Sequence, residues 1–174
     1  MWLARGYGAA RMGKVEQARA AAERLRELEA ITAKAGEDQF TRNVRILRLI
    51  VRAWLAFAEQ DRVLSVTLMR EAAELEASTP KHAVTPGATL PAHELLGDLF
   101  LAQGQPAEAL LAYRQSLGLY PGRFNSLAGA ARAARDSGDE LGARSFYRQL
   151  LDAADEATTR PAIDEARKFV SGAR

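Results

Sequence analysis

One stretch, Leu90 to Arg123, constrains the fold of this chain more than any other part of its sequence. Small and apolar residues recur at steps of three and four positions in each half of the stretch, which is the periodicity of one helical face. Between the halves lies Gly104-Gln105-Pro106, and glycine is suited to ending a helix while proline is suited to starting one. The stretch therefore predicts two antiparallel helices joined by a tight turn. Such a pair is too short to bury its apolar faces alone, so stacked copies are expected.

A second copy of this pattern follows directly. The turn residues Gly104 and Gly138 are 34 positions apart, and the surrounding small and aromatic positions repeat with them. The matching positions in the first copy are Leu96, Gly97, Phe100, Gly104, Ala109, Tyr113, Ser116 and Pro121, and those in the second are Ala131, Ala134, Gly138, Ala143, Tyr147 and Leu150.

This spacing resembles the tetratricopeptide repeat (TPR) family, except that Asp155 stands where the second copy would have its proline. The longer segment from Met69 to Tyr120 also resembles the C-terminal part of a group of bacterial multi-repeat proteins of largely uncharacterised function. The resemblance implies an all-α, right-handed superhelix whose concave face, formed by the first helix of each pair, holds peptides or partner helices. We expect a single domain over residues 1–174, with about four helix pairs at 1–34, 39–77, 90–123 and 124–157, and a C-terminal capping helix at 159–171.

The N-terminal half fits the same frame less regularly. Gly13 is the expected turn of the first pair, whereas Gln60-Asp61 replaces the turn glycine of the second pair. The repeat frame would begin before Met1, so we expect the chain to be a fragment of a longer protein. Ser78 to Ala88 contains two prolines and a glycine and predicts an irregular connection.

Composition narrows the class of protein further. The 24 basic and 22 acidic residues leave a net charge of +2, which does not indicate a nucleic-acid-binding protein. The chain has no cysteine, and we find no apolar run of the ~18 residues that a membrane span needs and no signal peptide. We therefore expect a soluble protein that interacts with neither nucleic acid nor membrane, and the choice between cytoplasm and periplasm stays open.

Chemistry-bearing motifs are few, so we expect no catalytic residues, no metal and no cofactor, and hence no enzyme. His93 has no second histidine one turn away, and Glu94 and Asp98 offer at most a weak cation site, so a solvated helix face is the favoured interpretation. The arginine stripe from Arg42 to Arg52 could meet phosphates or an acidic partner, but it is also what a solvated helix face looks like. The loop residues Lys81, His82 and Thr85 could contact a ligand, although a rigid connector is the favoured interpretation.

The resemblance to TPR proteins places a group of large and charged side chains on the face formed by the first helices. Aromatic residues and arginine dominate binding energy at desolvated interfaces, which makes this group the candidate site. Trp54 and Phe57 lie on a largely apolar helix, and burial between neighbouring helices explains Trp54 equally well. The candidate partner-binding residues are Tyr7, Arg11, Trp54, Phe57, Glu94, Asp98, Arg132 and Arg135.

We expect a non-catalytic scaffold that binds a protein or peptide of unknown identity. The family's cluster of lysine and asparagine that clamps a terminal carboxylate is missing, and Asn125 alone does not restore it. One alternative is a self-assembly module that makes a homo-oligomer. Another is a regulatory segment of a larger protein whose active site lies outside this chain.

Overall fold

The computed structural model describes residues 1–79, 88–155 and 158–172, and within them α-helix is the only regular secondary structure. This confirms the predicted all-α, TPR-like architecture of four helix pairs and a terminal helix. The pairs are α1 (Trp2–Arg11) with α2 (Val15–Lys34), α3 (Asp38–Ala58) with α4 (Arg62–Ser78), α5 (Ala92–Ala102) with α6 (Pro106–Leu119), and α7 (Phe124–Asp136) with α8 (Glu140–Asp152), followed by α9 (Pro161–Ser171).

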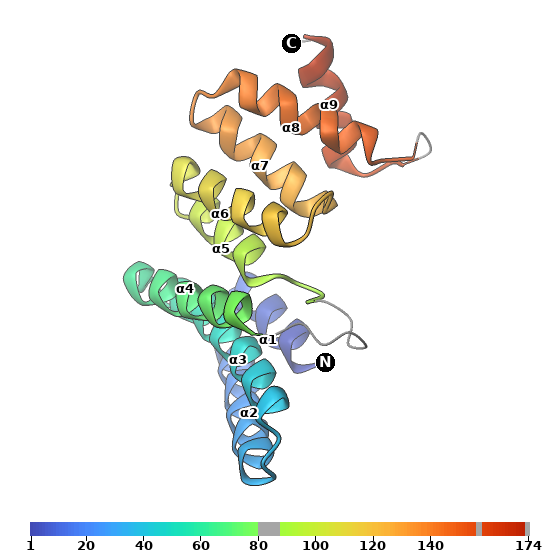
Figure 1. Cartoon of the computed structure of the whole chain (residues 1–174). Helices are drawn as coiled ribbons and strands as arrows, with labels where there is room; N and C mark the ends of the chain where they lie inside the picture. Colours follow the sequence, from blue (N-terminus) through green and yellow to red (C-terminus); the bar gives the residue numbers. More distant parts are fainter. Residues whose placement is uncertain (80–87, 156–157, 173–174) are drawn as a thin grey trace. The chain divides into compact units, whose positions relative to one another are not determined.

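The chain divides into two compact units, Met1–Leu95 and Leu96–Arg174, called unit 1 and unit 2 below. Helix α5 begins in unit 1 and ends in unit 2. Helices α1 to α4 lie in unit 1, and α6 to α9 lie in unit 2 (Figure 1). The expectation that residues 1–174 form one continuous domain depends on how the two units join, and it stays a prediction.

In unit 1, the two long helices α2 and α3 pack along each other, and α1 packs against both (Figure 1). Gly6 makes the close approach of α1 feasible, because a Cβ atom at this position would lie 2.6 Å from Cγ1 of Val51. Val51 itself is completely buried and belongs to a core cluster with Ala22 and Leu25. A small residue on α1 thus allows a β-branched side chain of α3 to fill the centre of the unit.

The arginine stripe of α3 is partly neutralised by neighbouring helices of unit 1. Arg45 pairs with Glu71 of α4 at 2.8 Å, and Arg48 pairs with Glu29 of α2 at 2.6 Å. The second pair is the more protected, with side chains 18% and 19% exposed. These arginines link three helices of unit 1, which adds a structural role to the solvated face that the sequence favoured.

The turns between paired helices use the left-handed backbone conformation. Gly13, Gly104 and Gly138 have φ of 71°, 74° and 84°, values that glycine adopts without steric cost. Gln60 takes the same conformation with φ of 67°, as expected for a residue that replaces the turn glycine. The following Asp61 caps α4, because its Oδ1 accepts a hydrogen bond of 2.9 Å from the backbone N–H of Leu64.

Tyr113 is the central packing element of unit 2. Its side chain is completely buried, and its hydroxyl donates a hydrogen bond of 2.6 Å to Oδ1 of Asp98. A Cβ atom added at Gly97 of α5 would lie 2.7 Å from the ring, and one added at Gly129 of α7 would lie 2.3 Å from it. The ring therefore occupies a slot between two helices that only glycine leaves open.

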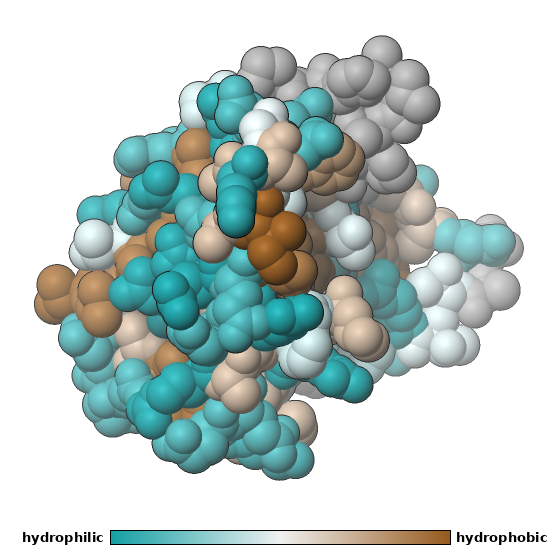
Figure 2. All heavy atoms as spheres, turned by 90° about the horizontal axis from the view of Figure 1, so that it is seen from below, coloured by the Kyte–Doolittle hydropathy of each residue, from teal (hydrophilic) through white to brown (hydrophobic). Residues whose placement is uncertain are grey.

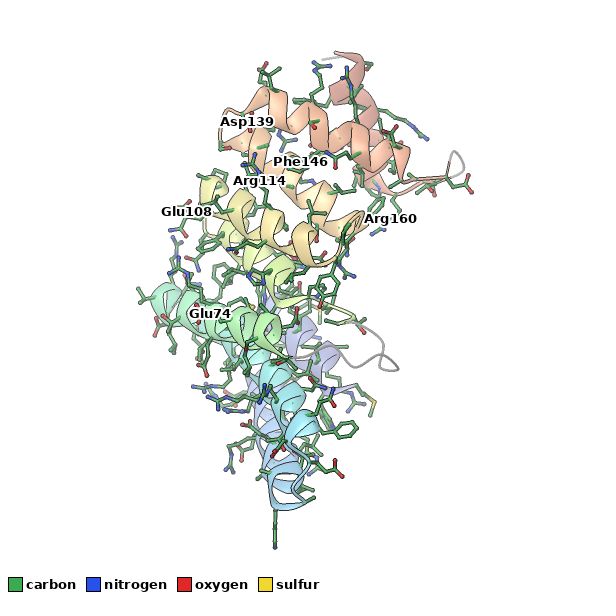
Figure 3. All side chains as sticks on the ribbon, in the orientation of Figure 1. Glu74, Glu108, Arg114, Asp139, Phe146 and Arg160 are labelled. Atoms are coloured by element: carbon green, nitrogen blue, oxygen red, sulfur yellow. The ribbon has the colours of Figure 1, made fainter. Side chains whose placement is uncertain are left out.

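Polar contacts on the second helices of unit 2 join the α6 and α8 layers. Arg114 of α6 lies 3.7 Å from Asp139, the N-cap of α8, and its guanidinium stands 5.9 Å from the ring centroid of Phe146 (Figure 3). Before α9, Arg160 stacks on Phe124 at 3.7 Å and donates to Oδ1 of Asn125 at 2.9 Å.

Helix α9 packs on α8 through Phe169, whose ring centroid lies 5.0 Å from that of Tyr147. Arg144 also holds this helix, since its Nη1 donates to the carbonyl oxygen of Val170 at 2.8 Å. Gly172 ends the helix with φ of 72°. Arg160 occupies the N-cap and makes no side-chain capping bond, because a guanidinium has no acceptor atom for the helix N–H groups.

The fit of the Tyr113 ring against Gly97 predicts that two glycines of unit 2 differ in how replacement by alanine changes stability. Gly97→Ala should lower the free energy of unfolding by ~1–3 kcal/mol, since the buried Tyr113 ring has glycine on both sides and no room to shift. Gly118→Ala on α6 is the matched control: no heavy atom lies within 4 Å of its added Cβ, so this change should stabilise by about 0.5 kcal/mol. Equal melting temperatures for the two variants would contradict the slot.

At the turn that contains Gln60, a substitution by glycine should stabilise the fold. Gln60→Gly should raise the free energy of unfolding by about 0.5–1 kcal/mol, because a side chain is costly in the left-handed region. The reciprocal change Gly138→Gln, at a turn with φ of 84°, should lower it by a similar amount. Urea denaturation would measure both, and a loss of stability in Gln60→Gly would show that this glutamine makes a compensating contact.

Candidate functional site

Unit 1 brings four of the predicted site residues together in one group, called the aromatic–arginine cluster: Tyr7 and Arg11 of α1, and Trp54 and Phe57 of α3. The ring centroids of Tyr7 and Trp54 are 5.4 Å apart and those of Trp54 and Phe57 are 5.6 Å apart, both in edge-on arrangements. Edge-on pairs add attraction to that of simple burial. The first helices of two successive repeats therefore present one continuous aromatic group.

Arg11 is held in place by this group. Its Nη1 donates a hydrogen bond of 3.0 Å to the hydroxyl of Tyr7, one turn earlier on α1. The guanidinium carbon lies 5.6 Å from the Tyr7 ring centroid and 5.4 Å from that of Trp54, which are cation–π distances. The side chain is nevertheless exposed, and within the described residues no carboxylate lies at salt-bridge distance from it.

Trp54 is buried, since only 3% of its surface is exposed. Its indole Nε1–H is also buried and has no hydrogen-bond acceptor among the described residues. A buried donor without an acceptor is uncommon, because leaving it unpaired costs about 1–3 kcal/mol. Phe57 is only half-buried, so the group runs from a buried indole to a partly open edge.

Glu94 and Asp98 of α5 have different environments from those that the sequence favoured. Glu94 is 2% exposed, so it does not lie on a solvated helix face. Asp98 is half-buried and accepts the hydroxyl hydrogen bond of Tyr113. His93 is buried as well, and desolvation lowers its pKa although the charge of Glu74 opposes this. A contact between Glu94 or Asp98 and a partner stays a prediction.

In unit 2, Arg132 and Arg135 of α7 both pair with Glu165 of α9. Arg132 Nε donates to Oε2 at 2.7 Å, and Arg135 Nη1 donates to Oε1 at 2.7 Å. The hydroxyl of Tyr147 donates to Oε1 as well, at 2.7 Å. The two arginines proposed as partner contacts therefore hold a carboxylate from the chain's own terminal helix.

The charges of this group stabilise one another. Partial burial alone would raise the pKa of Glu165, but the hydrogen bonds from Arg132 and Tyr147 and the charge of Arg132 outweigh burial and hold the pKa below its ordinary value. Burial, followed by the bond to Glu165, raises the pKa of Tyr147 above its ordinary value. The sequence pattern does not single out Glu165, although its place on the helix that follows α8 is a signal that it could face α7.

In the part of the chain that the structure describes, His, Asp and Glu side chains form no group of three or more that could hold a metal ion. Nor does any helix of that part have the length and apolar character to cross a membrane. The predicted loop contacts Lys81, His82 and Thr85 lie outside the described residues.

Comparison with known proteins supports the helical-repeat class. Five chains of solved structures match, among them the crystal structure of the MamA protein, which contains tetratricopeptide repeats. The match to MamA has a TM-score of 0.54 and 14% sequence identity, and it covers 92% of this chain and 96% of that one. No protein-family model matches the chain, and no curated protein does either. At this identity the likeness concerns the fold alone, which is TPR-like.

The Glu165 group predicts a pH-dependent attachment of α9. Because the pKa of Glu165 is lowered on folding, its contribution to stability is present above the ordinary carboxyl value of 4.5 and is lost as the pH falls through the lower folded-state value. Glu165→Gln should therefore cost ~1–3 kcal/mol near pH 7, with the difference from wild type shrinking on acidification. Thermal unfolding measured from pH 7 to pH 3 would test this dependence.

Asp164→Asn on the same helix is the matched control, since Asp164 is exposed and pairs with the exposed Arg167 at 3.6 Å. It should change stability by less than about 0.5 kcal/mol. Hydrogen exchange of the α9 backbone amides would localise the effect. A Glu165→Gln variant with unchanged α9 protection would show that the carboxylate does not hold the helix.

Proposed function

We propose that this protein is a non-catalytic scaffold that binds a protein or peptide on the face formed by its first helices. The observation that carries the proposal is the aromatic–arginine cluster, in which two successive first helices contribute to one site. Tyrosine, tryptophan and arginine are the residue types that dominate interface energetics. The TPR-like fold adds support, because repeat scaffolds use extended surfaces of this kind for recognition.

The two units contribute unequally to this proposed surface. Arg132 and Arg135 are engaged by Glu165. A partner that used these arginines would first have to displace α9 from its carboxylate contact. Arg11 has no such competitor among the described residues. Unit 1 is therefore the proposed primary contact, with Tyr7, Arg11 and Phe57 as the accessible members.

Self-assembly is the alternative that an experiment has to separate from binding of another protein. Figure 2 shows one face of the molecule, on which hydrophilic side chains predominate and apolar ones are scattered among them. Large apolar side chains exposed on unit 1 include Ile31, Phe40 and Val63. The predominance of hydrophilic side chains on the face in Figure 2 favours a heterologous partner over an extended apolar interface between copies.

Site-specific photocrosslinking in the native host would test the proposal. A photoreactive phenylalanine analogue placed at Tyr7 should crosslink to another protein, because this position lies in the proposed site. The same analogue at Val63, which is 80% exposed on α4, is the control and should not capture that protein. Adducts between two copies of this chain would support self-assembly instead, and the absence of position-dependent adducts would contradict a binding surface at Tyr7.

A further inference from the structure

We draw no further inference here: the strongest candidate, the exposed apolar side chains Ile31 and Phe40 at the adjoining ends of α2 and α3, carries none because nothing in the structure shows what covers them.

Discussion

Unit 2 depends on one steric arrangement, the fit of the Tyr113 ring between Gly97 and Gly129. The ring is completely buried, and it separates and aligns two first helices at the same time. Because packed interiors have few voids, the positions of these glycines determine how closely α5 and α7 approach. The Tyr113 hydroxyl then finds its acceptor on Asp98, so a large side chain is buried without leaving a polar atom unpaired.

Half of this arrangement was predictable from the sequence. Gly97 and Tyr113 occupy diagnostic positions of the repeat, and their spacing predicts contact. Gly129 does not, because the repeat frame assigns the matching position to Ala131, and only the actual rotation of α7 brings Gly129 to the ring. Periodicity identifies which face of a helix is buried, but the residue that meets a given side chain depends on tertiary packing.

The contacts of the candidate site could likewise be predicted from the sequence only in part. Register predicts that Tyr7, Arg11, Trp54 and Phe57 share a face, and the structure joins them through ring and guanidinium contacts. Register also placed Arg132 and Arg135 on such a face, but it could not show that Glu165 would reach them from α9. That pairing depends on the position of the terminal helix, which helix periodicity does not determine.

Arg11 in unit 1 and the pair Arg132 and Arg135 in unit 2 are held by different kinds of contact. In unit 2 the carboxylate belongs to the chain, so its interaction with the arginines contributes to folding, and a variant such as Arg132→Glu would detach α9 as well as alter a surface. In unit 1 the guanidinium of Arg11 instead lies against the rings of Tyr7 and Trp54. An arginine stacked on rings keeps its geometry without an anion, because the cation–π contacts hold it. Arg11 is thus positioned by aromatic rings, whereas Arg132 and Arg135 are positioned by the carboxylate of Glu165 on α9.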